Sequence, residues 1–284
     1  MLMQRSHLHT VSATILIAAL AGTGIFSGHA AAWDGDKHSA VRLIAGDSED
    51  TANGPLLRAG VEIKLAPGWK TYWRYPGDAG VPPQFDFAKS DNVKAVTVAW
   101  PAPKRLVDSE GTTIGYKTDV VFPLRVVPAD PARPVTLRLH LDYAICERLC
   151  IPVQGRAELV LKPGKGADHA AIAAAEKLVP KKLLLGAAGP FAVKAIKHDT
   201  AANPPRVSVD VAAPAGREID VFAEGPDAGW ALPVPDRAEG APSGYQRFVF
   251  ALDGLPPGKS AKGADLRITA VAGGDAIETT FRLD

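Results

Sequence analysis

The residues of this sequence with the most distinctive chemistry are Cys146 and Cys150, which are separated by three residues. Such a pair can form a structural disulfide, exchange disulfides with another protein, or supply half of a zinc site. Zinc would need two further ligands, and no histidine adjoins the pair. The two main interpretations are therefore a local structural staple and an exchanging redox pair.

Two properties of the pair favour exchange. Closing a loop this short removes little chain entropy, on the order of 2 kcal/mol, against about 4.7 kcal/mol for a loop of 100 residues. A tight loop at a strand end, followed by Pro152, is expected to be strained or exposed, and such disulfides tend to be labile. Arg148 would favour a thiolate, whereas Glu147 would oppose it. The residues alone leave the functional and the structural interpretation about equal.

The elements that position the cysteines are expected to be β-strands. Apolar and polar residues alternate along 135–143, which is the pattern of a half-buried strand. Similar segments recur through the chain between turns rich in glycine and proline. Further strands are expected at 56–65, 93–100, 120–127, 154–161, 191–197, 206–211, 218–223, 246–251, 265–272 and 276–283.

One segment departs from the strand pattern and indicates a helix. Residues 167–178 are rich in alanine, and Pro180 ends the segment. Many short strands on either side of a single helix predict an all-β protein with two β-sandwich domains. We expect a first domain at 33–165 with the cysteine pair, a helical connector at 166–189, and a second sandwich at 190–284.

The first 32 residues have the features of a secretory signal peptide. Arg5 is the only charged side chain before Asp34, the apolar run at 11–26 spans about 16 residues, and alanines at 30–32 offer a cleavage site. A membrane-spanning helix needs roughly 20 apolar residues. We therefore expect cleavage near Ala32, a periplasmic location and no stable membrane anchor.

The composition argues against several classes of function. Beyond residue 32 the chain keeps 31 of its 32 basic residues against 31 acidic ones, so nucleic acid is not an expected partner. Both methionines precede residue 32 and the histidines are scattered, so neither a metal site nor a cofactor is expected. No motif of a hydrolase or a nucleotide-binding enzyme is present.

Four motifs occur in a fixed order around the cysteines: GWKTYWRYPGDAGVPP at 68–83, WPAP at 100–103, TIGYK at 113–117 and YAICERLCIP at 143–152. Together they resemble the amino-terminal periplasmic domain of the DsbD thiol:disulfide interchange proteins, especially the branch with the ScsB-type suppressors of copper sensitivity. The resemblance covers about residues 40–162 and implies an immunoglobulin-like domain with a redox-active cysteine pair. The second half fits the tandem immunoglobulin-like domains of that branch by analogy.

The resemblance also implies a function and partners. The family domain takes electrons from a membrane-embedded cysteine domain and passes them to periplasmic oxidoreductases. Cys150 would attack the partner disulfide and Cys146 would resolve the mixed disulfide. The cysteines are more closely spaced than in the best-known members, and the chain ends at Asp284 without a membrane domain. We therefore expect a separate membrane thiol reductase as electron source and periplasmic thioredoxin-like or disulfide-isomerase proteins as acceptors, in copper tolerance or cytochrome c biogenesis.

The family has a cap loop over the cysteine pair, and the corresponding segment here is 107–116. Ile114 or Tyr116 would cover the sulfurs, while Asp108 and Glu110 would tune the pKa values of the thiols. The alternative is an ordinary hairpin loop.

The aromatic residues Trp69, Tyr72 and Trp73 are a candidate partner surface, although packing in the core is the favoured interpretation. Arg74 is expected to pair with a carboxylate or to approach the cysteine loop. His140 shares strand parity with Cys146, which would let the two lie close together, although a histidine at the surface is the favoured interpretation. The alternative function is a β-sandwich binding or scaffold module in which the disulfide is only structural.

Overall fold

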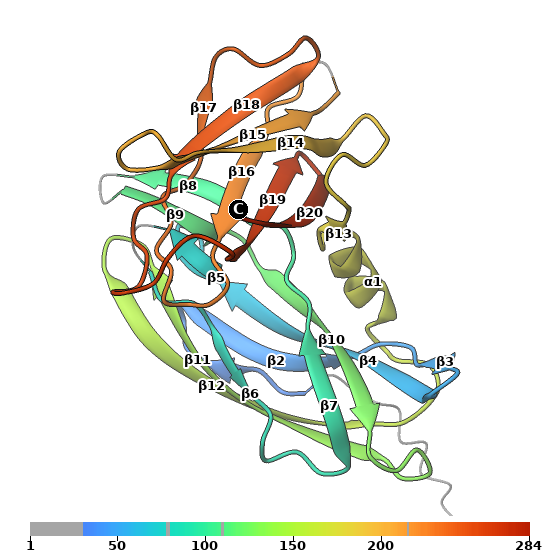
Figure 1. Cartoon of the computed structure of the whole chain (residues 1–284). Coiled ribbons are helices and arrows are strands. Elements are labelled where there is room, and N and C mark those ends of the chain that lie inside the picture. The colour runs from blue at the N-terminus through green and yellow to red at the C-terminus, as the bar shows by residue number, and fades with distance from the viewer. Residues whose placement is uncertain (1–30, 78–79, 109–110, 215) are drawn as a thin grey trace, which may run out of the picture.

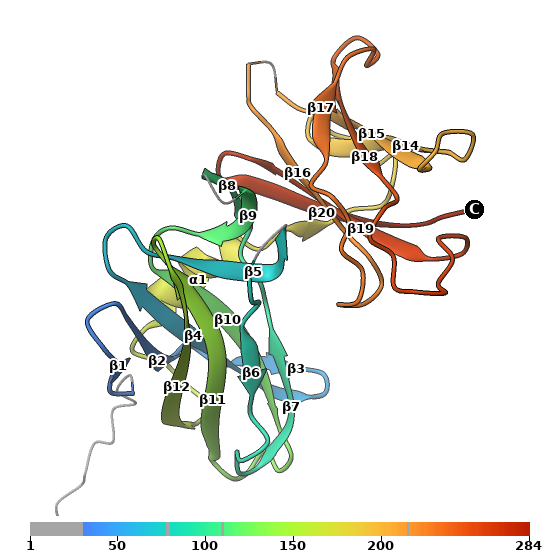
Figure 2. The same ribbon diagram turned by 90° about the vertical axis from the view of Figure 1, so that its left-hand side faces the viewer.

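The computed structural model describes residues 31–77, 80–108, 111–214 and 216–284, so the expected signal peptide lies almost wholly outside the described residues. These residues form two β-sandwich bodies with α1 (His169–Lys177) near their junction (Figures 1 and 2). The expected fold class is confirmed: the protein is all-β, with two tandem immunoglobulin-like bodies joined by a short helix. Of the residues that are described, none belongs to a helix long and apolar enough to cross a membrane.

The first body consists of two antiparallel sheets that face each other. One has the strand order β1-β2-β4-β10-β7 with β3 on β4, and the other has the order β12-β11-β5-β9-β8 with β6 on β11. The strands are β1 (Asp34–Gly35), β2 (Ser39–Ala45), β3 (Glu49–Thr51), β4 (Gly54–Leu65), β5 (Lys70–Gly77), β6 (Gln84–Asp86), β7 (Val93–Val98), β8 (Lys104–Asp108), β9 (Gly111–Tyr116), β10 (Val120–Pro128), β11 (Val135–Cys146) and β12 (Cys150–Leu161).

The core of the first body lies between these sheets. The alternation along β11 turns Val135, Leu137, Leu139 and Leu141 inward, where they meet Phe122 of β10 and other apolar residues. Each such side chain contributes about 1.5–3 kcal/mol when it is fully buried. The sheet that carries the cysteines is therefore fixed by the packing of its inner face.

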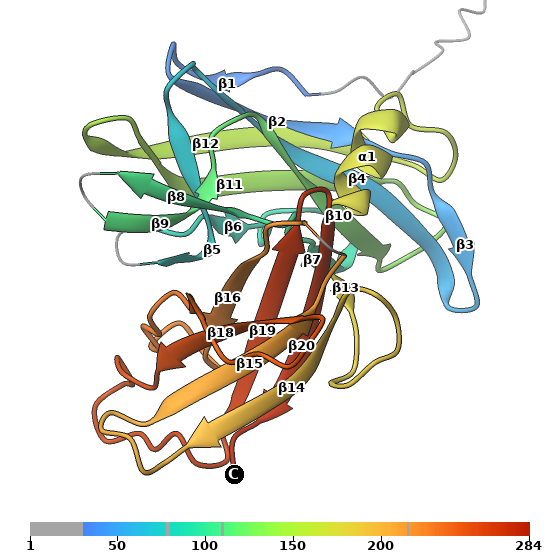
Figure 3. The same cartoon turned by 90° about the horizontal axis from the view of Figure 1, so that it is seen from above.

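The second body is a smaller sandwich of two four-stranded sheets, with the orders β13-β20-β19-β16 and β14-β15-β18-β17. Its own core includes Val209, Phe248, Phe250 and Ile268. Seen from above, its strands lie to one side of the first body (Figure 3). The strands are β13 (Lys181–Lys182), β14 (Ala192–Asp199), β15 (Arg206–Ala212), β16 (Asp220–Glu224), β17 (Asp236–Ala238), β18 (Tyr245–Ala251), β19 (Asp265–Ala272) and β20 (Asp275–Arg282).

The segment between the bodies is attached to both of them. Helix α1 packs on β4 and β10, and Glu176 of α1 accepts a hydrogen bond of 3.0 Å from Arg58 Nε of β4. After the helix, β13 adds in parallel to β20 of the second body. The connector is therefore anchored at each end by regular structure.

Candidate redox site

The two cysteines face each other across a β-hairpin. Cys146 ends β11 and Cys150 begins β12, and the two are register partners in an antiparallel ladder. Their sulfurs form a disulfide across a Cα–Cα distance of 4.1 Å. The loop that joins them consists of three exposed residues, Glu147, Arg148 and Leu149. The pair therefore lies at the tip of the longest hairpin of the first body.

The two halves of the disulfide differ in their access to solvent. Cys146 is only 6% exposed, whereas Cys150 belongs to the exposed residues of the hairpin. The fold thus covers Cys146 more fully than Cys150. Thiol–disulfide exchange depends on which sulfur is accessible, so this asymmetry assigns the two cysteines different chemical positions.

Tyr72 of β5 covers the disulfide. Its hydroxyl lies 3.1 Å from Cys150 Sγ, and its ring packs with Ala144 and Cys146 in a small apolar cluster apart from the main core. Gly80 lies against the ring, because a Cβ atom at that position would come within 2.5 Å of two ring carbons. Tyr72 is therefore held tightly, with its hydroxyl directed at the sulfur of Cys150.

Lys70 places a buried positive charge on the same face of the sheet. It is the register partner of Cys146 across β5 and β11, and it is almost fully buried. Its ammonium donates a 3.1 Å hydrogen bond to Thr113 Oγ1 of β9. The ammonium thus lies on the β9 side of β5, and a cation on this face of the sheet favours a thiolate over a thiol. Residue types alone did not single out Lys70, because its proximity to Cys146 depends on the pairing of distant strands.

The expected cap segment forms a hairpin of β8 and β9 beside β5. The structure places Ile114 and Tyr116 in the core of the first body, on the face of the sheet opposite Tyr72 and the disulfide. Gly115, which lies between them in sequence, pairs with Tyr72 and faces the same side of the sheet as the disulfide. Its neighbours Ile114 and Tyr116 face the opposite side, so neither side chain covers the sulfurs. Asp108 ends β8 but its side chain is not described, and Glu110 lies outside the described residues.

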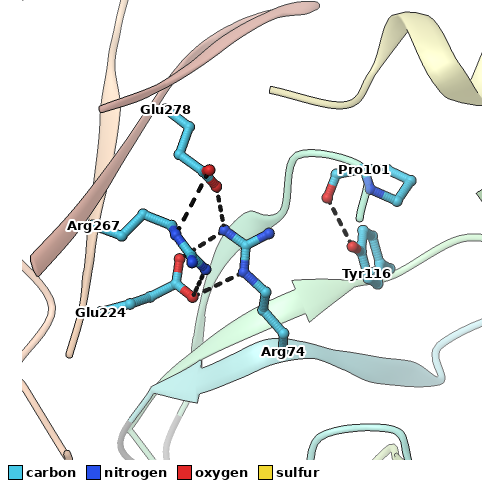
Figure 4. Close-up of polar contacts among 6 residues, drawn as sticks. All are labelled: Arg74, Pro101, Tyr116, Glu224, Arg267 and Glu278. Atoms are coloured by element: carbon cyan, nitrogen blue, oxygen red, sulfur yellow. Dashed lines mark hydrogen bonds and ion pairs between the residues drawn. The ribbon is translucent and has the colours of Figure 1, made fainter. Parts of the chain in front are cut away.

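Tyr116 is surrounded by residues of the core. Its hydroxyl donates a 2.8 Å hydrogen bond to the Pro101 carbonyl (Figure 4), and its ring meets Phe122 edge to face. Burial raises the pKa of Tyr116 well above its ordinary value of 10.0, although the charge of Arg74 opposes this shift. The hydroxyl therefore stays protonated and serves as a donor within the core.

The three aromatic residues considered as a partner surface are buried instead. Trp69 and Trp73 lie on the inner face of β5 and its preceding turn, within the main core, and Tyr72 lies against the disulfide. Exposed apolar side chains occur elsewhere: Leu149 and Ile151, on either side of Cys150, are 76% and 40% exposed. The sequence signal that could have found this apolar contact surface is the position of Leu149 and Ile151 directly beside Cys150 in a short polar loop.

His140 is not part of the site. It lies on β11 opposite Arg156, six residues from Cys146, which corresponds to about 20 Å along a strand. Its Nε2 atom is 3.4 Å from Asp142 Oδ2. Among the residues that the structure describes, no group of three or more histidine, cysteine or acidic side chains is arranged to hold a metal ion.

Comparisons with known proteins agree with this geometry. Residues 41–162 match the family described as thiol:disulfide interchange protein DsbD, N-terminal. The chain is similar in structure to the N-terminal periplasmic domain of ScsB from Proteus mirabilis, with a TM-score of 0.70 and 22% sequence identity over 90% of this chain and 99% of that chain. No curated protein matches the sequence. The structural similarity shows that the fold of both bodies is shared. The first body, which carries the disulfide, therefore belongs to the DsbD amino-terminal family of thiol:disulfide interchange domains.

Proposed function

We propose that this protein is a periplasmic thiol–disulfide interchange protein that passes reducing equivalents to oxidised partner proteins through Cys146 and Cys150. The observation that carries the proposal is the asymmetry of the pair. Cys150 is exposed beside the Tyr72 hydroxyl, and Cys146 is buried behind it. An attacking thiol must be accessible, whereas a resolving thiol needs only to reach its neighbour.

The exchange runs in two steps. In the reduced protein the Cys150 thiolate attacks one sulfur of the partner disulfide, forming a mixed disulfide and releasing the first partner thiolate. Cys146 then loses its proton and attacks Cys150 Sγ, which re-forms the internal disulfide and releases the second partner thiolate. Two electrons pass to the partner, whose two thiolates take up protons. The register of β11 and β12 supports the second step, because it holds Cys146 directly opposite Cys150.

The hydroxyl of Tyr72 and the ammonium of Lys70 have distinct roles in this proposal. The hydroxyl donates a hydrogen bond to the Cys150 thiolate, which stabilises the nucleophile. The ammonium of Lys70 lowers the cost of negative charge on this face of the sheet. Both effects favour the dithiol form and make the protein a weaker reductant than an isolated dithiol.

The partners follow from the surface around Cys150 and from the expected export signal. Leu149 and Ile151 offer an apolar rim suited to the apolar surroundings of a cysteine in a thioredoxin-like or disulfide-isomerase protein. A separate membrane thiol reductase would return the electrons. The periplasmic location rests on the expected signal peptide at residues 1–32.

A trapping experiment tests the proposal. In Cys146→Ala the exposed Cys150 keeps its nucleophile and loses the resolving thiol, so stable mixed disulfides are expected in periplasmic extract. Cys150→Ala is the matched control, because its remaining thiol is buried and should trap little. The reduction potential of the wild-type pair is expected to lie above about −300 mV, the range of labile disulfides. A potential far below that value, together with no trapped partner, would identify the disulfide as structural.

A further inference from the structure

Strand β5 follows an irregular path directly after Tyr72. It pairs with β9 at Thr71 and Tyr72, and the register then shifts before Gly77 pairs with Thr113. Between Tyr72 and Gly77 β5 advances five residues while β9 advances two, so part of β5 bulges out of the ladder. This bulged segment lies between Tyr72 and Gly80, the residue that packs on the Tyr72 ring.

The second body supplies the contacts that the ladder does not. Consecutive residues of the bulge reach three of its segments. The Trp73 ring lies 5.9 Å from the Phe222 ring, Arg74 pairs with Glu224 and Glu278, and the Tyr75 hydroxyl donates a 2.5 Å hydrogen bond to the Leu232 carbonyl. The path of β5 between Tyr72 and Gly77 is therefore held by the second body as well as by the packing of Trp73 in the core of the first body.

Arg74 makes the strongest of these contacts. Its guanidinium donates to both carboxylate oxygens of Glu224 at 2.8 Å and to Glu278 at 2.6 Å (Figure 4). The three side chains are only 18%, 8% and 10% exposed, and Arg267 adds a second cation near both acids. Removing one partner from such a cluster leaves a buried charge without compensation. The cluster is therefore a stiff attachment.

The electrostatics of Arg74 agree with a stiff attachment. Burial by itself would lower the pKa of this guanidinium, but its hydrogen bonds and ion pairs with Glu224 and Glu278 outweigh burial and raise the pKa. Arg74 thus remains charged at every pH at which the protein is folded.

The second body also holds the hairpin beside β5. Arg105 of β8 donates a 2.6 Å hydrogen bond to the Pro235 carbonyl, and its Nε atom is 3.3 Å from Asp220 of β16. The hairpin includes Thr113, which accepts the hydrogen bond of Lys70. Strand β5 and the hairpin beside it are thus both tied to the second body.

We propose that the second body braces the redox site, with Arg74 as a positioning residue that sets the path of β5 and so holds the Tyr72 hydroxyl against Cys150. The proposal rests on the redox function proposed above for the cysteine pair. According to this proposal, contacts made by the second body influence the reactivity of the cysteine pair in the first body. A purely structural contact would change stability and leave the chemistry of the sulfurs unaltered.

The test compares Arg74→Met with Arg58→Met in the full chain. Arg58 pairs with Glu176 of the connector and contacts neither β5 nor the hairpin tip, so it is a matched control. The redox equilibrium with glutathione is measured for each purified variant. Loss of the hydroxyl from Cys150 should shift that equilibrium toward the disulfide by about 3-fold to 10-fold in Arg74→Met. Arg58→Met should match the wild type.

A double-mutant cycle with Tyr72→Phe identifies the route of the effect. If Arg74 acts through Tyr72, the shift in Arg74→Met/Tyr72→Phe will equal that in Tyr72→Phe alone. Fully additive shifts, or a change in melting temperature with no change in the glutathione equilibrium, would overturn the proposal. If Arg74→Met does not fold, Arg74→Met/Glu224→Gln/Glu278→Gln removes the unpaired charges and gives the same comparison.

The glutathione equilibrium needs no partner protein. An unchanged glutathione equilibrium in Arg74→Met would therefore contradict the positioning role of Arg74. An absence of trapped partners would instead contradict the proposed exchange with other proteins.

Discussion

Replacing Tyr72 by phenylalanine removes a single oxygen atom from the surroundings of Cys150. The ring that packs on Cys146 and Ala144 is retained, so the apolar cluster should keep its shape. What disappears is the hydroxyl 3.1 Å from Cys150 Sγ. The substitution therefore separates the hydrogen bond from the packing.

The magnitude follows from the charge of the acceptor. A hydrogen bond to a charged group contributes about 1.5–3 kcal/mol, and sulfur accepts less strongly than oxygen, so we expect the lower end for a thiolate. A neutral disulfide sulfur gains little. About 1.4 kcal/mol corresponds to one pKa unit and to about 30 mV for a two-electron couple. Tyr72→Phe should thus raise the pKa of the Cys150 thiol by about one unit. It should lower the reduction potential by about 30 mV at pH values above that pKa.

Two measurements check this prediction. The pKa is read from the ultraviolet absorbance of the thiolate as pH is varied, and the potential from equilibrium with glutathione. Tyr143→Phe is the control, because its hydroxyl pairs with Ser39 Oγ at 2.7 Å on the opposite face of β11. Identical pKa values in Tyr72→Phe and the wild type would refute the view that this hydroxyl stabilises the nucleophile.

Three further predictions concern charge, backbone contact and pH. Lys70→Met removes the buried cation and should raise the pKa of the Cys150 thiol by about half to one unit. The pKa is measured from the rate of alkylation against pH, and an unchanged profile would exclude an influence of Lys70 on the thiol. Gly115→Ala places a Cβ 2.1 Å from the Thr71 carbonyl oxygen and should lower stability by about 3 kcal/mol in chemical denaturation, whereas Gly274→Ala meets nothing within 4 Å and should change it little. Asp47 has a pKa lowered from 3.8, chiefly by a backbone hydrogen bond, so its carboxylate stabilises the fold above that pH and the stabilisation is lost as pH falls through the lowered value. Asp47→Asn should therefore melt at a lower temperature at neutral pH, with the difference vanishing as pH falls below the lowered pKa of Asp47, as thermal scans would show.

Strands that turn one face to the core and the other toward solvent were predictable from the sequence. The predicted strand at 265–272 has the same bounds as β19, and the one at 206–211 falls one residue short of β15. In both strands the residues that face the core recur at alternate positions, which is the signal that periodicity detects. The predicted strand at 135–143 ends before Cys146 because polar residues no longer alternate with apolar ones after Tyr143. In the structure β11 continues to Cys146, and its last four residues are buried on both faces.

Strand β5 was not predictable in the same way. Its residues Lys70, Thr71, Tyr72 and Trp73 are all buried, so burial does not alternate with position. Covering of the outer face depends on the hairpin, the disulfide and the second body, which are distant in sequence. The cysteines could be found by residue type, but Tyr72 and Lys70 join the site only through the pairing of β5 with β11.

The register of the cysteine hairpin determines how much the protein would rearrange in the proposed exchange. The ladder of β11 and β12 runs without a shift from the Val135–Leu161 pair to the Cys146–Cys150 pair. The backbone hydrogen bonds of the hairpin hold the two cysteines opposite each other, with or without the bond between the sulfurs. We therefore expect reduction to free two side chains and to leave the strands in place. We therefore expect the proposed exchange to need little reorganisation of the backbone, so that repeated cycles proceed without refolding of the domain.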